Sequence, residues 1–154
     1  MKSQLRDALA AFTGRDVVFS VLRFRMEGLL RFRAAFGADA ASSLLRVIAH
    51  SLASDLWRTD IVGRWANDEF LVILNSCNAE SLPAVRERLR RMLANDAIEW
   101  WGERRSLRLS IGETTAQPGD TVESILDRAQ RSLDRASQWL SNTIGAENKE
   151  SSES

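Results

Sequence analysis

The pattern of apolar and polar positions changes between helical and extended spacing along the chain. Apolar residues at helical spacing predict a leading helix over residues 3–13. The stretch DVVFSVLRFR, residues 16–25, is rich in β-branched and aromatic side chains and predicts a largely buried strand at the centre of a sheet. Two helices are expected next, over residues 27–35 and about 39–57. Gly37, between them, can adopt the left-handed conformation that ends a helix.

The second half of the chain predicts two hairpins separated by a helix. Two apolar runs flank a polar turn within residues 60–74, which predicts the first hairpin, and a helix follows over about residues 80–94. The stretches AIEWW (97–101) and RSLRLSIGET (105–114) predict the second hairpin. A last helix is expected over about residues 121–140.

This order of elements predicts an α+β fold. Its core resembles a βαββαβ arrangement, and the full order of strands and helices, βααββαββα, predicts a mainly antiparallel sheet of about five strands flanked by helices. We expect one domain over residues 1–144, with residues 1–14 as its leading helix. The tail GAENKESSES, residues 145–154, has little apolar surface to bury and is expected to be disordered.

Composition narrows the class of protein. The chain has 21 Lys and Arg and 21 Asp and Glu, so no overall charge attracts nucleic acid or anionic lipid. Its single cysteine, Cys77, cannot form an internal disulfide, which suits a reducing compartment. No apolar stretch approaches the roughly 20 residues that span a bilayer. We therefore expect a soluble cytoplasmic domain with no membrane segment and no nucleic-acid partner.

The predicted hairpin GRWANDEFLVIL, with LRLSIG downstream, resembles a GGDEF domain, the family of the diguanylate cyclases and their inactive relatives. The resemblance covers about residues 5–144 and implies a cyclase-like fold in cyclic di-GMP signalling. The following positions fall in register with the family: Phe36-Gly37, Asp60, Arg64, Trp65, Asp68-Glu69-Phe70, Ser110-Ile111-Gly112, Gly119-Asp120-Thr121, Ala129, Ala136 and Asn142.

The metal-binding and turn positions depart from the active members of the family. The resemblance places Ala66 and Asn67 where active members have the two glycines that let the backbone approach GTP. It places Arg25 where they have the aspartate that holds Mg²⁺ between the phosphates. Glu27 falls at the position of a second acid and lacks that partner. The guanidinium of Arg25 would repel a divalent cation, so no metal or other cofactor is expected.

The base and phosphate contacts implied by the family are also replaced. Arg33 and Ser42 stand at the positions of the asparagine and aspartate that read guanine. Leu30 replaces a lysine that contacts phosphate. In the last helix, Ser137 and Ser141 replace the lysine and arginine that steady the phosphates. The resemblance therefore implies an inactive relative of the cyclases.

The family's product-inhibition site survives only in part. That site is an RxxD motif completed by an arginine on the next helix, and here the motif reads WRTD, with Trp57 in place of the arginine. Asp60 and Arg88 remain, Arg58 is a neighbouring cation, and Trp57 could stack on a guanine. Loss of the bidentate arginine favours weak or absent cyclic di-GMP binding.

The acids of the signature turn, Asp68 and Glu69, are interpreted as structural. We hypothesise that Arg25 supplies the positive charge that a metal gives in relatives, by pairing with Asp68 or Glu69 and tying the hairpin to the central strand. Arg25, Glu27, Asp68 and Glu69 would then be vestigial positions of a reaction centre, within a signature of Ala66, Asn67, Asp68, Glu69 and Phe70.

Other notable residues predict contacts rather than catalysis. His50 and Cys77 lack the partners of a metal site, and the basic segment 86–91 is interpreted as a solvated helix face. Adjacent residues of a strand point to opposite faces, so either Trp100 or Trp101 is a candidate for an interface, while the alternative that all the tryptophans fill the core stays open.

The sequence favours a catalytically inactive GGDEF-like domain that acts as a regulatory or protein-interaction module in bacterial cyclic di-GMP signalling. Its expected partner is a protein, with a homodimer as one possibility. Two alternatives remain open at this point: a divergent diguanylate cyclase that converts two GTP to cyclic di-GMP, and a sensor domain that binds GTP or cyclic di-GMP.

Overall fold

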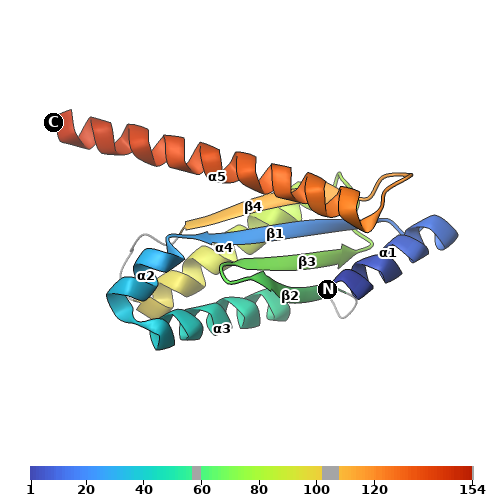
Figure 1. Cartoon of the computed structure of the whole chain (residues 1–154), viewed down its shortest axis with the longest axis horizontal. Coiled ribbons are helices and arrows are strands. Elements are labelled where there is room, and N and C mark those ends of the chain that lie inside the picture. Colours follow the sequence, from blue (N-terminus) through green and yellow to red (C-terminus); the bar gives the residue numbers. More distant parts are fainter. Residues whose placement is uncertain (57–59, 102–107, 154) are drawn as a thin grey trace.

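The computed structural model describes residues 1–56, 60–101 and 108–153. None of the helices it describes is long and apolar enough to cross a bilayer. The elements, shown in Figure 1, are in chain order α1 (Lys2–Arg15), β1 (Phe19–Glu27), α2 (Leu29–Phe36), α3 (Ala38–Asp55), β2 (Ile61–Ala66), β3 (Glu69–Asn75), α4 (Leu82–Trp101), β4 (Arg108–Thr115) and α5 (Val122–Glu153).

The described strands form one antiparallel sheet in the order β2-β3-β1-β4. β1 is central and pairs with both β3 and β4, so the predicted central strand and the predicted β2–β3 hairpin are confirmed. In this register Arg25 of β1 lies opposite Glu69 of β3 and opposite Ser110 of β4. Three residues from distant parts of the sequence are thus brought into one row across the sheet.

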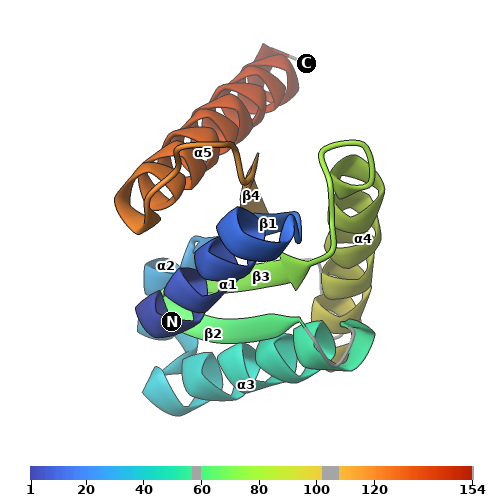
Figure 2. The same cartoon turned by 90° about the vertical axis from the view of Figure 1, so that its right-hand side faces the viewer.

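Helices cover both faces of the sheet (Figure 2). Alternate residues of a strand point to opposite faces, and two apolar cores result. The core on the α3 and α4 side includes Leu22, Phe24, Leu44, Ile48, Phe70 and Leu89, all buried. The core on the α1 and α5 side includes Leu5, Val21, Leu71, Ile73, Ile125 and Ala129. The fold class predicted from the sequence is therefore confirmed.

The strand predicted over residues 97–101 is wrong, because α4 continues through Trp101 and the described sheet has four strands. Aromatic and β-branched residues in AIEWW favour a strand by propensity. The spacing of Leu89, Leu93, Ala97 and Trp101 also suits one face of a helix that has already begun. The expectation that Trp100 and Trp101 alternate across a strand fails with the strand, and their side chains lie outside the described residues.

The C-terminal helix is longer than the sequence predicts. α5 runs to Glu153 and passes well beyond the sheet in Figure 1, so the backbone of residues 145–153 is helical, whereas a disordered tail was expected over residues 145–154. The tail is polar but contains Ala, Glu and Lys, which have high intrinsic helix propensity. The domain boundary at residue 144 stays a prediction.

The loop that precedes α5 is fixed by a carboxylate. Arg128 donates to both oxygens of Asp120, at 2.9 and 2.7 Å, while Ser124 Oγ and the Gln117 backbone N–H add further hydrogen bonds. The hydrogen bonds from Arg128 lower the pKa of Asp120 to about 2, against the opposing effect of burial. Ionised Asp120 therefore stabilises the folded state.

Replacing Asp120 with asparagine should lower the free energy of unfolding by about 2 kcal/mol at neutral pH, which is the free-energy equivalent of the lowered pKa of Asp120. A depressed pKa in the folded state means that this stabilisation is complete above pH ~4 and is lost as the pH falls toward 2. Urea denaturation of both proteins between pH 2 and 7 checks the effect. Asp127→Asn, in an exposed pair with Arg131, is the control. A difference between Asp120→Asn and the wild type that does not change with pH would contradict this assignment.

Candidate functional site

Three of the four predicted vestigial residues, Arg25, Glu27 and Glu69, meet on the side of the sheet that α5 covers. Arg23, Arg25 and Glu27 alternate along β1 and therefore share one face. Glu69 approaches this face from β3 and Ser110 from β4, each opposite Arg25 in the register. The β-sheet pairing thus assembles the site, and α5 closes it.

Glu69 lies between two guanidinium groups. Arg25 donates to Glu69 Oε1 from Nε at 3.1 Å and from Nη2 at 2.8 Å, while Arg23 Nη2 forms an ion pair with Glu69 Oε2. The side chains of Arg23 and Glu69 are only 6% and 7% exposed. The hypothesised pairing of Arg25 with an acid of the signature is confirmed for Glu69. The sequence analysis missed Arg23, although its position two residues before Arg25 on a strand signals a shared face.

The environment of Arg25 favours its charged form. Burial alone would lower the pKa of Arg25, but the hydrogen bonds and negative charge of Glu69 outweigh burial and raise it, with smaller contributions from Glu27 and Asp134. Arg25 Nη1 also lies 3.6 Å from Asp134 Oδ1 and 3.3 Å from Ser137 Oγ, both on α5. Arg25 therefore connects the sheet to the covering helix.

Glu27 completes the network through hydroxyl groups. Ser110 Oγ donates to Glu27 Oε1 at 3.0 Å, and Ser137 Oγ donates to the same oxygen. Ser137 thus contacts both Glu27 and Arg25. The network of Arg23, Arg25, Glu27, Glu69, Ser110 and Ser137, called here the arginine–glutamate network, joins β1, β3, β4 and α5.

Trp65 of β2 gives Arg23 a second electrostatic partner. The guanidinium carbon of Arg23 lies 5.7 Å from the centroid of the Trp65 ring, within the range of a cation–π interaction. Arg23 Nε is buried and has no hydrogen-bond partner in the described part of the chain. The aromatic ring therefore contributes to holding this charge in a buried position.

A glycine allows α5 to approach the network. A Cβ atom added at Gly112 of β4 would lie 2.5 Å from the backbone N of Leu133 and 2.6 Å from the carbonyl oxygen of Ala129. The backbone of α5 therefore crosses β4 directly at Gly112. Ser137 follows Leu133 by one helical turn, so this contact sets the distance at which Ser137 reaches Arg25 and Glu27.

The first three signature residues, Ala66, Asn67 and Asp68, are outside the network. Arg64 Nη2 donates to the carbonyl of Asn67 at 2.7 Å, and the Asp68 carbonyl accepts from the Met26 N–H at 2.8 Å. Ala66 and Asn67 are exposed, and neither has a positive φ angle. Asp68 contributes its backbone to these contacts, and it is Glu69 that forms the predicted ion pair with Arg25.

Phe70, the last residue of the signature, has a packing role. It is 3% exposed and belongs to the core on the α3 and α4 side. Its strand neighbour Glu69 points to the opposite face. The hairpin therefore directs one signature residue into each side of the sheet.

The residues of the possible cyclic di-GMP site are only partly described. Trp57 and Arg58 lie outside the described residues. Asp60 Oδ1 accepts a hydrogen bond from the Asn75 backbone N–H at 2.9 Å, which ties the two ends of the β2–β3 hairpin. Arg88 is exposed on α4. The structure thus gives Asp60 a structural contact, while nucleotide binding by this group stays a prediction.

The positions that the resemblance aligns with base and phosphate contacts lie on α2, α3 and α5. Leu30 and Arg33 are exposed on α2, and Ser42 is exposed on α3. Ser137 belongs to the arginine–glutamate network, and the side chain of Ser141 lies outside the described residues. Nucleotide binding at these positions stays a prediction from the sequence.

The residues present do not fit a divalent cation. Both carboxylate oxygens of Glu69 accept hydrogen bonds from cationic guanidinium groups. Glu27 Oε1 accepts hydrogen bonds from the hydroxyl groups of Ser110 and Ser137. A metal at the end of β1 would have to displace Arg25 and would then face its positive charge at short range. The acidic side chains of this site are therefore already bound by arginine and serine side chains.

Comparison with known proteins identifies related sequences. Residues 1–143 match the family model described as "Diguanylate cyclase, GGDEF domain". The chain is 30% identical over 123 residues to diguanylate cyclase DgcP of Pseudomonas aeruginosa, covering 80% of this chain and 18% of that protein. It is 30% identical over 129 residues to response regulator PleD of Caulobacter vibrioides, covering 82% and 28% respectively. The chain thus spans less than a third of these relatives' length.

Solved structures share the fold. The P. aeruginosa diguanylate cyclase SiaD, in complex with its activator SiaC, superposes with a TM-score of 0.81 at 24% identity, over 89% of this chain and 53% of that one. The active GGEEF domain of a Vibrio cholerae diguanylate cyclase gives 0.81 at 20% identity, over 89% and 87%. These likenesses bear out the cyclase-like fold.

Proposed function

Because the chain belongs to the GGDEF domain family, we propose that it is a catalytically inactive member that regulates or scaffolds other proteins in bacterial cyclic di-GMP signalling. The observation that carries this proposal is the position of Glu69 between Arg23 and Arg25. Phosphoryl transfer depends on cations that neutralise charge on the phosphates. Here the cationic groups are protein side chains already paired with a carboxylate.

The arrangement of positive and negative side chains in this site supports the same proposal. An active centre of this type concentrates acidic oxygens toward a metal, whereas this site places two guanidiniums against Glu69 and leaves Glu27 with hydroxyl partners. The proposal therefore includes no metal cofactor and weak or absent binding of GTP and cyclic di-GMP. The network's contribution is to hold the hairpin, the central strand and α5 together.

Two exposed apolar side chains on α2 support a role in protein contacts. Leu30 is 81% exposed and Phe36 is 45% exposed on α2, the large hydrophobic side chains most open to solvent in the described residues. The Phe36 ring packs on Phe32 at a centroid distance of 5.0 Å, which orders it before any partner binds. The related cyclase SiaD is itself bound by a protein activator. We therefore propose a protein partner.

Incubation of the purified chain with GTP and Mg²⁺ or Mn²⁺ should yield no cyclic di-GMP above a heat-inactivated control, with the product measured by liquid chromatography and mass spectrometry. An active GGDEF domain assayed in parallel shows that the conditions support turnover. Sustained production of cyclic di-GMP by this chain would show that it is a divergent cyclase and would refute the proposal. Calorimetric titration with GTP and with cyclic di-GMP tests the sensor alternative, which saturable micromolar binding would establish.

A further inference from the structure

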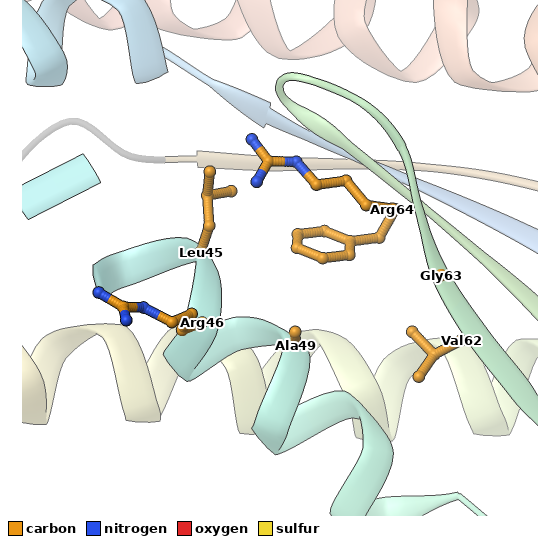
Figure 3. Close-up of a pocket in the computed structure, with 7 residues that line it drawn as sticks. Leu45, Arg46, Ala49, Val62, Gly63 and Arg64 are labelled. Carbon is orange, nitrogen blue, oxygen red and sulfur yellow. The ribbon is translucent and has the colours of Figure 1, made fainter. Parts of the chain in front are cut away.

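A cavity of about 250 Å³ lies between α3 and the edge strand β2, on the side of the sheet opposite the arginine–glutamate network. Figure 3 shows Leu45 and Ala49 of α3 and Val62 of β2 around it, with Arg64 reaching from β2 toward α3. The lining residues are Leu45, Arg46, Ala49, Val62, Gly63, Arg64 and Phe70. The walls are therefore apolar and the charged groups belong to the two arginines.

The volume indicates what the cavity can hold. Pockets that enclose whole small-molecule ligands usually measure about 300–1,000 Å³. A cavity of about 250 Å³ lies below that range and suits a single large apolar side chain. Protein interfaces commonly place such an anchor side chain in an apolar pocket near the centre of the contact.

The positive charge at the edge of the cavity indicates which residues would flank the anchor side chain in a partner protein. Arg46 and Arg64 are both exposed, and no acidic residue belongs to the described lining. Arg46 makes a hydrogen bond of 3.3 Å to Ser43 Oγ, and Arg64 donates to the carbonyls of the signature turn. Neither guanidinium has a carboxylate partner in the part of the chain that the structure describes, so both favour an anionic neighbour outside the cavity.

The geometry points to a docking site for a partner protein that inserts one apolar side chain between α3 and β2 and places carboxylates beside Arg46 and Arg64. This inference rests on the proposed role in protein contacts and names the surface and the chemistry of the partner. The partner's binding segment is acidic and carries an aromatic or branched anchor.

Three blocked, fluorescein-labelled pentapeptides test the inference by fluorescence anisotropy: Asp-Glu-Phe-Glu-Asp, Asp-Glu-Gly-Glu-Asp and Lys-Lys-Phe-Lys-Lys. We expect saturable binding of the first peptide and at least about tenfold weaker binding of the other two, because they lack either the anchor or the negative charge. No saturable binding of the first peptide, or equal binding of the glycine peptide, would overturn the inference.

Two substitutions separate filling of the cavity from loss of charge. Ala49→Leu adds side-chain volume inside the cavity, and Arg46→Glu reverses one charge at its edge; each should weaken binding of the first peptide by about tenfold or more. Arg135 is exposed on α5, away from the cavity, so Arg135→Glu is the matched charge control and should leave binding of the first peptide unchanged. Circular dichroism and melting temperature verify that all variants are folded. Undiminished binding by the folded Ala49→Leu variant would contradict the inference.

Analytical ultracentrifugation tests whether a second copy of this chain, rather than a separate acidic protein, occupies the cavity. Self-association of the wild-type chain that Ala49→Leu abolishes would identify a second copy as the occupant and would overturn a separate acidic partner. Failure of the peptide experiments together with absence of cyclase turnover would reject this docking site and leave the proposed function standing. Turnover of GTP would reject the proposed function whatever the peptides do.

Discussion

Replacing Glu69 with glutamine should lower the free energy of unfolding by about 3–5 kcal/mol, since it leaves Arg23 and Arg25 as positive charges without their shared carboxylate. For a chain of this length the melting temperature should fall by about 10 °C. Calorimetric melting of the wild-type and Glu69→Gln proteins measures the effect. The size of the loss follows from burial, because the Glu69 side chain is 7% exposed.

Arg25→Ala is the informative comparison for this prediction. It should also lower the melting temperature, but by less, because Glu69 keeps Arg23 as its partner and Arg25 is 22% exposed. Asp127→Asn, which removes an exposed carboxylate from a pair on α5, should barely change it. If Glu69→Gln melts at or above the wild-type temperature, the ion pairs do not stabilise this fold.

Gly112→Ala should destabilise the chain by about 3 kcal/mol, at the upper end of the usual range for an overpacked site. The added methyl carbon would overlap the backbone of α5 at Ala129 and Leu133, and backbone atoms cannot rotate away as a side chain can. α5 must therefore move away from β4, and Ser137 moves with it. Urea denaturation gives the change in free energy.

Gly14→Ala provides the matched control for Gly112. Gly14 lies in α1 and an added Cβ would meet nothing within 4 Å, so alanine should stabilise the helix by about 0.5–1 kcal/mol. Nearly equal effects of the two substitutions would show that α5 does not contact β4 as closely as described.

The hairpin and the central strand could be predicted because several local signals agree. A polar turn separates two apolar runs at residues 60–74, and β1 is rich in β-branched and aromatic residues. The structure places the turn and both strands where these patterns indicate. A pairing of Arg25 with either Asp68 or Glu69 could also be inferred from the charge reversal at residue 25, and the structure shows that the partner is Glu69.

The features that were missed depend on tertiary context. Residues 97–101 have strand propensity, but they directly follow a helix whose spacing they continue, and α4 extends through them. Arg23 reads locally as one polar residue in a strand; its importance appears only when Glu69 and Trp65 are placed beside it. Pairing between strands carries this information, and the sequence of one strand does not contain it.

The ion pairs connect stability to the proposed function. Glu69 stabilises the sheet because both its oxygens are bound by arginines, and the same two positive charges repel any cation that approaches those oxygens. A variant in which Glu69 has lost its arginine partners, and could therefore bind a metal, would also be less stable than the wild type. The proposed loss of catalysis and the internal bracing of the fold are two results of one charge arrangement.

Crystals grown with Mn²⁺ and a non-hydrolysable GTP analogue test this account most directly, because manganese is located by its anomalous scattering. The account predicts no anomalous peak within coordination distance of Glu69 or Asp68, with Glu69 still bound to Arg23 and Arg25. A manganese peak at the end of β1, coordinated by these carboxylates with Arg25 displaced and the nucleotide attached, would contradict it.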